Sequence, residues 1–211
     1  MITVYYTSYT LQQGKKKHEL EHEFGLLLLQ KGLKEQFHLS LEIQELEEKL
    51  KNEAHGKPYL RGEENIHFNI SHCNGLVACA LSDEQVGLDV EEIQDFKESL
   101  PKRILSDKEQ EYLAGFQADT MQYREQFFRF WTLKESYVKW DGRGFLKEPR
   151  DISFELDLKK DPIEITFSDK EGLCETNTAF YQEKIKDMYF LAVCSRQLSE
   201  HKNIYIIKED F

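Results

Sequence analysis

The chain of 211 residues is long enough for one large domain or for two small ones of about 100 residues each. Hydrophobic residues make up 40% of it and aromatic residues 12%, which excludes wholesale disorder. With 28 basic against 39 acidic side chains, the formal net charge is -11. Such a surface repels phosphates overall, so no nucleic acid is expected as a partner.

Neither a membrane segment nor a disulfide framework is expected. The longest purely aliphatic run, residues 26–29, is too short to span a bilayer, and the N-terminus lacks the pattern of a signal peptide. The cysteines show no C-x-x-C spacing, and Cys79 and Cys194 lie in apolar runs, which favours buried thiols over a zinc site. We therefore expect a soluble cytoplasmic protein that does not interact with membranes.

The first part of the chain predicts strands around one long helix. Residues 2–9 mix β-branched and aromatic side chains, as in a strand, and residues 15–31 place apolar side chains at helical spacing. Residues 39–50 have a helical period, with room for a short strand before the turn at Gly56 and Pro58. Three strands then follow in the manner of an antiparallel meander, at residues 66–70, 76–81 and 86–91.

After Glu92 the pattern changes to helix. Ser106 and Glu109 fit a capping box that opens a helix to about residue 116, and a longer helix is expected over 121–140. Strands should follow near residues 152–154, 163–167, 176–185, 189–194 and 204–207. The apolar segment 189–195 faintly echoes residues 75–81, and no flexible linker separates the halves. We expect an α+β fold with an N-terminal half (1–95) and a C-terminal half (96–211), each a small, mostly antiparallel sheet with helices.

Two carboxylates share one face of the strand predicted at residues 86–91. Strand alternation sends Val86, Leu88 and Val90 to one side, and Asp89 and Glu91 to the other. A solvated strand face is the ordinary explanation for such acids. However, like charges two residues apart repel, and aspartate is disfavoured in strands. A hard cation such as Mg²⁺ would reverse this penalty, because it prefers carboxylate oxygens.

The long helix carries a second polar set. Trp131, Glu135 and Lys139 are four residues apart and lie along one face. Taken alone, Glu135 and Lys139 would be an exposed ion pair worth about 0.3–0.5 kcal/mol. A helix this rich in aromatic residues is mostly buried, which favours a position for the pair beside a cleft.

Ser71 and His72 directly follow a predicted strand. A turn serine and a satisfied histidine are the usual explanation, and no G-x-S-x-G elbow supports a Ser-His nucleophile. As donors to a phosphate the pair makes better chemical sense, and Lys57 in Gly56-Lys57-Pro58 would add a positive charge. The sequence contains neither a P-loop nor a Rossmann glycine fingerprint.

Together these motifs resemble a known family. G-K-P at 56–58, F-N-I-S-H at 68–72, V-G-L-D-V-E at 86–91 and W-T-L-K-E-S-Y-V-K at 131–139 are similar, in order and spacing, to 4′-phosphopantetheinyl transferases of the long, pseudo-dimeric type. Each motif is short, but four in register are specific. The resemblance implies two similar α+β halves with the active site in the cleft between them, coenzyme A as donor, Mg²⁺ as cofactor and a carrier-protein serine as acceptor.

The resemblance also implies roles for individual residues. Asp89, Glu91 and Glu135 match the acidic metal-site residues. Lys139 matches the lysine at the pyrophosphate and the reacting centre, so Asp89, Glu135 and Lys139 form the expected catalytic set. The expected coenzyme A contacts are Lys57, Ser71, His72 and Lys139. No role follows with the same specificity for residues 15–17 and His22.

The expected activity is Mg²⁺-dependent transfer of phosphopantetheine to an acyl or peptidyl carrier protein, of the holo-[acyl-carrier-protein] synthase type, releasing adenosine 3′,5′-bisphosphate. Glu135 is the candidate general base, acting directly or through a metal-bound water. The protein is expected to act as a monomer. The alternative is a catalytically silent coenzyme A or nucleotide-binding regulatory module, which would not need the carboxylates or Lys139.

Overall fold

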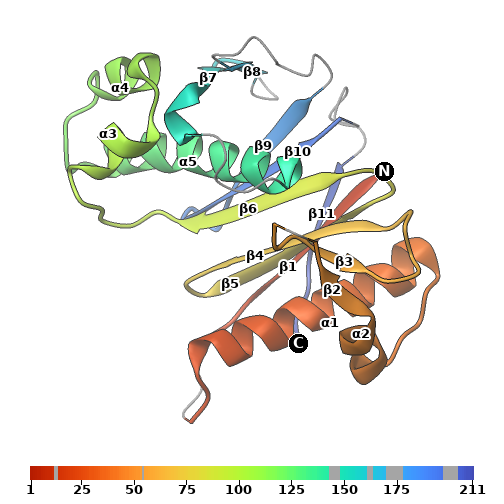
Figure 1. Ribbon diagram of the computed structural model, residues 1–211. Helices are drawn as coiled ribbons and strands as arrows, with labels where there is room; N and C mark the ends of the chain where they lie inside the picture. Colours follow the sequence, from red (N-terminus) through yellow and green to blue (C-terminus); the bar gives the residue numbers. More distant parts are fainter. Residues whose placement is uncertain (12–13, 54, 143–147, 161–163, 170–177, 197–203) are drawn as a thin grey trace.

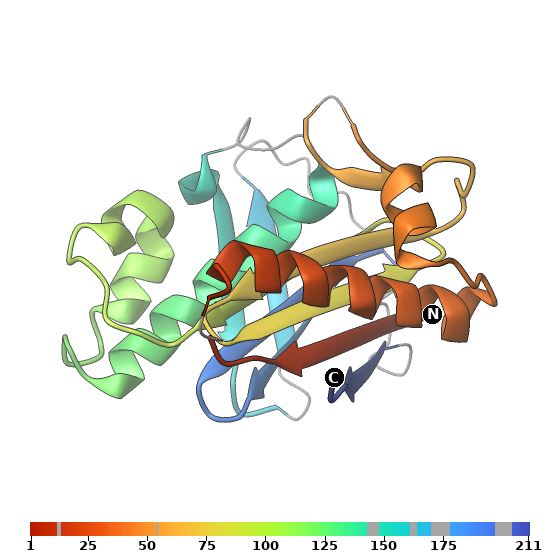
Figure 2. The ribbon, with the colours of Figure 1, turned by 90° about the horizontal axis from the view of Figure 1, so that it is seen from below.

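Two small β-sheets stack face to face between two long helices, which gives the molecule four layers (Figures 1 and 2). The structure is a computed structural model that describes residues 1–211 except 12–13, 54, 143–147, 161–163, 170–177 and 197–203. In Figure 1 the helix α1 lies below the two sheets and the helix α5 lies above them.

The first sheet has the strand order β11-β1-β5-β4. Its pairs are antiparallel except for β1 and β11, which run parallel, so the end of the chain lies beside its beginning. Helix α1 (Lys17–Phe37) packs on the outer face. The strands are β1 (Ile2–Ser8), β4 (His67–Cys73), β5 (Leu76–Ser82) and β11 (Ile204–Lys208).

The second sheet is antiparallel throughout, with the order β6-β10-β9. Helix α5 (Met121–Asp141) packs on its outer face, mainly over β6 and β10. The helix begins at the Thr120 cap and ends at Gly142, whose positive φ of 71° closes the last turn. The strands are β6 (Val86–Glu92), β9 (Ala179–Ile185) and β10 (Tyr189–Ser195).

Short elements fill the remaining connections. Before β4 come α2 (Ile43–Lys49) and the small hairpin of β2 (Leu50–Asn52) and β3 (Pro58–Leu60). Between β6 and β9 lie α3 (Leu100–Ile104), α4 (Asp107–Leu113), the 3-10 turn η1 (Pro149–Asp151), and the hairpin of β7 (Ile152–Asp157) and β8 (Glu164–Asp169).

One inner strand of each sheet, β5 in the first and β10 in the second, is buried on both faces, which explains the two apolar runs in the sequence. In β5, Val77 and Cys79 pack under α1, whereas Leu76 and Ala78 pack against the second sheet. In β10, Phe190 packs under α5 and its neighbours face the first sheet. The two segments that echo each other are thus inner strands of the two sheets, and the predicted α+β fold with small, mostly antiparallel sheets and helices is confirmed.

The predicted three-stranded meander is wrong in one strand. β4 and β5 form the expected hairpin, but β6 pairs with β10 because β1 already occupies the other edge of β5. Conversely, β11 returns to the first sheet. The two parts of the sequence thus exchange one strand each, and the division at residue 95 stays a prediction.

Other predicted helices and strands are confirmed, with boundaries that differ from the predicted ones by a few residues. The ambiguous segment 39–50 is a helix followed by a short strand, and the capping box of Ser106 and Glu109 opens α4. Helix α3 was missed. Cys79 and Cys194 are buried and free, as expected. Within the described part of the chain, every helix is too short or too polar to cross a membrane.

Candidate active site

Helix α5 rests directly on the carboxylate-bearing face of β6. A side-chain carbon at Gly87 would overlap the Ser136 carbonyl oxygen and the Trp140 backbone nitrogen, so only glycine permits this approach. Val86, Leu88 and Val90 face the space between the sheets, as alternation predicted. Asp89 and Glu91 are therefore left facing the helix that carries Glu135 and Lys139.

A hydrogen-bonded triangle forms the centre of this contact. The ammonium of Lys139 lies 2.6 Å from Asp89 Oδ1 and 2.9 Å from Ser71 Oγ, and the Ser71 hydroxyl lies 3.1 Å from the same Asp89 oxygen. Asp89 is only 3% exposed. Its second oxygen, Oδ2, is buried and finds no hydrogen-bond partner among the described residues. One coordination position of a buried carboxylate thus stays open.

Two further carboxylates flank the triangle. Burial, with the charge of Asp89 next in importance, raises the pKa of Glu91 to about 7; Trp131, whose indole N–H donates to Glu91 Oε1 at 2.8 Å, acts in the opposite direction. Burial and the charge of Asp89 also raise the pKa of Glu135 to about 6. The single ammonium of Lys139 does not offset the repulsion within this group, so a further cation would stabilise it.

The donor chemistry of this group fits a divalent metal ion. Carboxylate oxygens are the ligands that Mg²⁺ prefers. Here two of the three carboxyl groups have raised pKa values, and the third, Asp89, has an oxygen without a hydrogen-bond partner among the described residues. In their present rotamers, no three His, Cys, Asp or Glu side chains of the described residues converge closely enough to hold an ion. Asp89 is turned to Lys139 and Glu91 to Trp131. The residues fit the ion in chemistry, and Asp89 Oδ2 is the oxygen that is already open to it.

Side chains of β4 join the two sheets at this point. Asn69 Oδ1 accepts a hydrogen bond from the Leu88 backbone N–H at 2.9 Å, and Ser71 Oγ accepts one from the Val90 N–H at 3.2 Å. Alternate residues of β4 thus satisfy alternate amides on the free edge of β6, in place of a backbone ladder. Asn69 was missed by sequence reasoning, although its place in F-N-I-S-H, two residues before Ser71, was a usable signal.

His72 lies on the opposite face of β4 from Ser71. The predicted strand ended too early: β4 continues through both residues, so alternation separates their side chains. His72 is half exposed, and its Nδ1 lies 3.4 Å from Oε2 of the buried Glu21. It lines a cavity of about 430 Å³ together with His18 and His22. The structure therefore places Ser71 in the carboxylate centre and His72 beside a separate, histidine-lined cavity.

The basic residues at the start of α1 are already paired with acids. Lys15 contacts Glu23 at 2.7 Å, and Lys17 lies 3.6 Å from Glu21. His22, beside the cavity, lies 3.6 Å from Glu47. His18 and His22 line the cavity wall together with Glu21, whereas Lys15 and Lys17 are not among its lining residues.

Lys57, from the turn of the β2–β3 hairpin, lies near Lys139 rather than among the carboxylates. It lines a smaller cavity of about 230 Å³ that is also lined by Asn69, Lys139 and Gly142. Its ammonium donates to the backbone carbonyls of Val86 at 3.2 Å and of Trp140 at 3.3 Å. Lys57 and Lys139, which the resemblance linked to the same ligand, therefore share one cavity.

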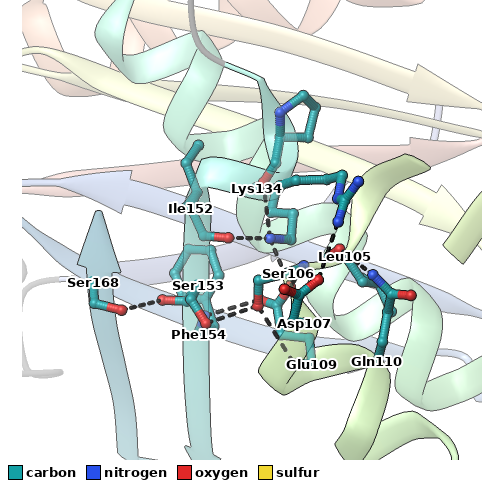
Figure 3. A network of polar contacts seen from close by, with 12 residues as sticks. Leu105, Ser106, Asp107, Glu109, Gln110, Lys134, Ile152, Ser153, Phe154 and Ser168 are labelled. Atoms are coloured by element: carbon teal, nitrogen blue, oxygen red, sulfur yellow. Dashed lines mark hydrogen bonds and ion pairs between the residues drawn. The ribbon is translucent and has the colours of Figure 1, made fainter. Parts of the chain in front are cut away.

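Helix α5 is anchored on its other side by a buried ion pair (Figure 3). Lys134 is 1% exposed, and its ammonium lies 2.7 Å from Glu109 Oε2 and also donates to the carbonyls of Pro149 and Ile152. Glu109 in turn accepts hydrogen bonds from the backbone N–H groups of Ser106 and Phe154. The pair fixes the helix beside Glu135, and sequence reasoning, which followed the face of Trp131, Glu135 and Lys139, missed it.

Comparisons with known proteins point to one family. The model of the 4′-phosphopantetheinyl transferase superfamily matches residues 85–194. A 4′-phosphopantetheinyl transferase of Bacillus subtilis is 33% identical over 144 residues, covering 68% of this chain and 61% of the relative. 4′-Phosphopantetheinyl transferase Sfp of Bacillus subtilis (strain 168) is 31% identical with the same coverage. The aligned region thus spans about three fifths of these relatives.

A solved structure is also similar. It is a holo-(acyl-carrier-protein) synthase from Bacillus anthracis in complex with CoA (3′,5′-ADP), with 19% identity and a TM-score of 0.40. The similarity covers 52% of this chain and 92% of that one. The matched region of the superfamily model contains Asp89, Glu91, Glu135 and Lys139, whereas Lys57, Ser71 and His72 precede it.

Proposed function

The chain belongs to the 4′-phosphopantetheinyl transferase superfamily, and on that premise we propose that it transfers the 4′-phosphopantetheine moiety of coenzyme A to a serine of an apo carrier protein. The observation that carries the proposal is the meeting of Asp89, Glu91, Glu135 and Lys139 where α5 rests on β6. All these residues come from one chain, which supports the proposal that the enzyme acts as a monomer. The carrier is an acyl or peptidyl carrier protein.

Asp89, Glu91 and Glu135 would hold Mg²⁺. When bound, the ion would neutralise charge on the pyrophosphate of coenzyme A and on the departing phosphate. The buried, unpartnered Asp89 Oδ2 and the raised pKa values of the two glutamates support this assignment.

The chain's own groups supply the proton transfer and part of the charge stabilisation. The carrier serine Oγ attacks the phosphorus that bears pantetheine, and the bond from that phosphorus to the bridging oxygen breaks. Adenosine 3′,5′-bisphosphate leaves with the bridging oxygen, and Glu135 accepts the serine proton. With a pKa of about 6, Glu135 is largely ionised at neutral pH and suits this role. Lys139 stabilises the charge on the leaving phosphate.

Ser71 and His72 are proposed to hold different parts of coenzyme A. Ser71 lies 2.9 Å from the Lys139 ammonium and is placed for the pyrophosphate. His72 lines the larger cavity with His18 and His22, where imidazole N–H groups suit a phosphate remote from the reaction. Apolar side chains of Leu26, Phe68 and Ile70 line the same cavity and suit a nucleobase.

The test is to incubate the protein with coenzyme A, Mg²⁺ and an apo carrier protein and then to measure the carrier's intact mass. We expect the mass to rise by one phosphopantetheine, and not to rise with a carrier whose acceptor serine is alanine. Glu135→Gln should abolish the gain, whereas the matched variant Glu92→Gln, at the far end of β6, should retain it. An unchanged carrier mass together with tight coenzyme A binding would favour the silent binding module instead.

A further inference from the structure

A buried carboxylate lies in the wall of the cavity that is lined by His18, His22 and His72. Glu21 is 5% exposed and lies on α1 between the two histidines of that helix. A carboxylate repels the phosphate that the imidazoles are proposed to bind, and burying a charge is costly unless the charge is paired. The place of Glu21 in this wall therefore needs a physical reason.

One oxygen of this carboxylate is anchored by Tyr9. The Tyr9 hydroxyl donates to Glu21 Oε1 at 2.7 Å and lies 3.3 Å from the Cys73 carbonyl oxygen, while the Tyr9 backbone N–H donates to the Gly75 carbonyl at 3.0 Å. Burial and the hydrogen bond to Glu21 raise the pKa of Tyr9, so its hydroxyl keeps the proton that it donates. Tyr9 therefore connects Glu21 to the end of β4, the strand that carries His72.

The other oxygen of Glu21 faces one nitrogen of His72. Oε2 lies 3.4 Å from Nδ1, whereas Nε2 has no hydrogen-bond partner among the residues that the structure describes. In a neutral imidazole only one nitrogen carries a proton, so a ring whose Nδ1–H faces a carboxylate can offer a second N–H only as the imidazolium cation. The carboxylate stabilises that cation, and the N–H at Nε2 then gives a phosphate a charge-assisted hydrogen bond.

The other charged groups near the ring have different positions. Lys17 Nζ lies 3.6 Å from Glu21 Oε1, and Glu47 Oε1 lies 3.6 Å from His22 Nε2. On the neighbouring strand β5, the residue opposite His72 is the uncharged Val77. In the described part of the chain, Glu21 is thus the acid that faces His72.

We infer that Glu21 is a positioning residue: it holds the His72 ring by Nδ1, so that Nε2 meets a phosphate of the donor substrate. The consequence for binding rests on the proposed function, whereas the contact between Glu21 and His72 does not. The sign of the effect separates two explanations. Simple repulsion predicts that removing the charge of Glu21 tightens the binding of a polyanion, whereas positioning predicts that it weakens binding.

The binding experiment uses Glu21→Gln, which keeps the shape and removes the charge. Glu23→Gln, an exposed glutamate of the same helix that pairs with Lys15, is the matched control. By titration calorimetry we expect the Kd for coenzyme A to rise about fivefold or more in Glu21→Gln and to stay within about twofold in Glu23→Gln. The Kd for dephospho-coenzyme A, which lacks the 3′-phosphate, should stay within about twofold in both variants. In a His72→Ala background, Glu21→Gln should no longer weaken the binding of coenzyme A.

Several results of this experiment would overturn the inference. Unchanged or tighter binding of coenzyme A by Glu21→Gln would mean that the carboxylate only repels the ligand or has no role. Equal weakening for coenzyme A and dephospho-coenzyme A, or equal weakening with and without His72, would mean that Glu21 acts on the fold and not through the histidine. If Glu21→Gln does not fold, Tyr9→Phe, which removes only the anchor on Oε1, should weaken the binding of coenzyme A at least about twofold and leave dephospho-coenzyme A unaffected.

The orientation of the ring is tested in the free protein. At about pH 9, where imidazole groups are uncharged, ¹⁵N–¹H correlation spectra should place the His72 ring proton on Nδ1 in the wild type and on Nε2 in Glu21→Gln. A proton on Nε2 in both proteins would overturn the inference. If the wild type does not bind coenzyme A, the proposed function fails, but the position of this proton still decides whether Glu21 holds His72.

Discussion

The carboxylates of β6 and α5 should make the metal-free protein less stable as the pH rises. Glu91 and Glu135 have pKa values of about 7 and about 6 in the folded protein, above their ordinary value of 4.5. At a pH between the ordinary and the folded pKa, the folded state binds more protons than the unfolded state. The stability that these protons contribute is complete below pH 4.5 and is lost as the pH rises through the folded pKa values. At about 1.4 kcal/mol per pKa unit, the upper limits are roughly 3 kcal/mol for Glu91 and 2 kcal/mol for Glu135.

The two limits are not independent, because each glutamate shares its repulsion with Asp89. The perturbation that isolates one contribution is Glu135→Gln, which keeps the shape and removes the charge. In this variant we expect the decline in unfolding free energy between pH 5 and pH 7.5 to be smaller by about 1 kcal/mol, because part of the 2 kcal/mol limit is already lost below pH 5.

The assay is urea unfolding at both pH values in a chelator, with Glu92→Gln as the matched loss of one carboxylate outside the cluster. In the wild type, adding Mg²⁺ should stabilise the protein more at pH 7.5 than at pH 5, because the ligands must be ionised. Equal pH dependence in the wild type, Glu135→Gln and Glu92→Gln would refute the claim that burial and mutual repulsion raise these pKa values.

Three further predictions concern single side chains. Asp89→Ala should be nearly inactive while still folded, as should the wild type in excess chelator, because several kcal/mol of transition-state stabilisation are lost; near-normal carrier modification in either case would refute the metal assignment. His72→Ala should raise the KM for coenzyme A more than it lowers kcat, because the contact is remote from the reacting phosphorus. Dephospho-coenzyme A should be a poorer donor for the wild type. If neither change has an effect, the cavity of His18, His22 and His72 is not the binding site. Lys134→Met should lower the free energy of unfolding by roughly 3–5 kcal/mol, because Glu109 then stays buried without a cation. The double variant Lys134→Met/Glu109→Leu should lose less stability. If urea unfolding shows no difference between the two variants, this account of the ion pair is contradicted.

Periodicity alone predicted the elements that carry the acidic site. Strand alternation assigned Asp89 and Glu91 to one face of β6, and four-residue spacing put Glu135 and Lys139 on one face of α5. These local patterns hold because each element buries its apolar side, Val86, Leu88 and Val90 in the strand and the aromatic residues in the helix. Periodicity did not predict that these acids would face a common site. That prediction came from the family resemblance and from the aromatic character of the helix.

Contacts between distant segments could not be predicted in this way. The move of β6 into the second sheet depends on which strand edges are already occupied, and that is decided by β1 and β10. The bonds from Asn69 to Leu88 and from Lys57 to Trp140 join segments far apart in the sequence and leave no periodic signal. The separation of Ser71 from His72 was predictable, since extending the strand alternation by two residues assigns them to opposite faces.

The most direct test of the proposed reaction is its stoichiometry. Adenosine 3′,5′-bisphosphate released from coenzyme A would be quantified by chromatography beside the amount of modified carrier in the same sample. We predict one nucleotide for each carrier modified, and no nucleotide when either the carrier or the divalent cation is omitted. Nucleotide release without carrier modification, or intact coenzyme A after prolonged incubation with both, would contradict the assignment of a phosphopantetheinyl transferase.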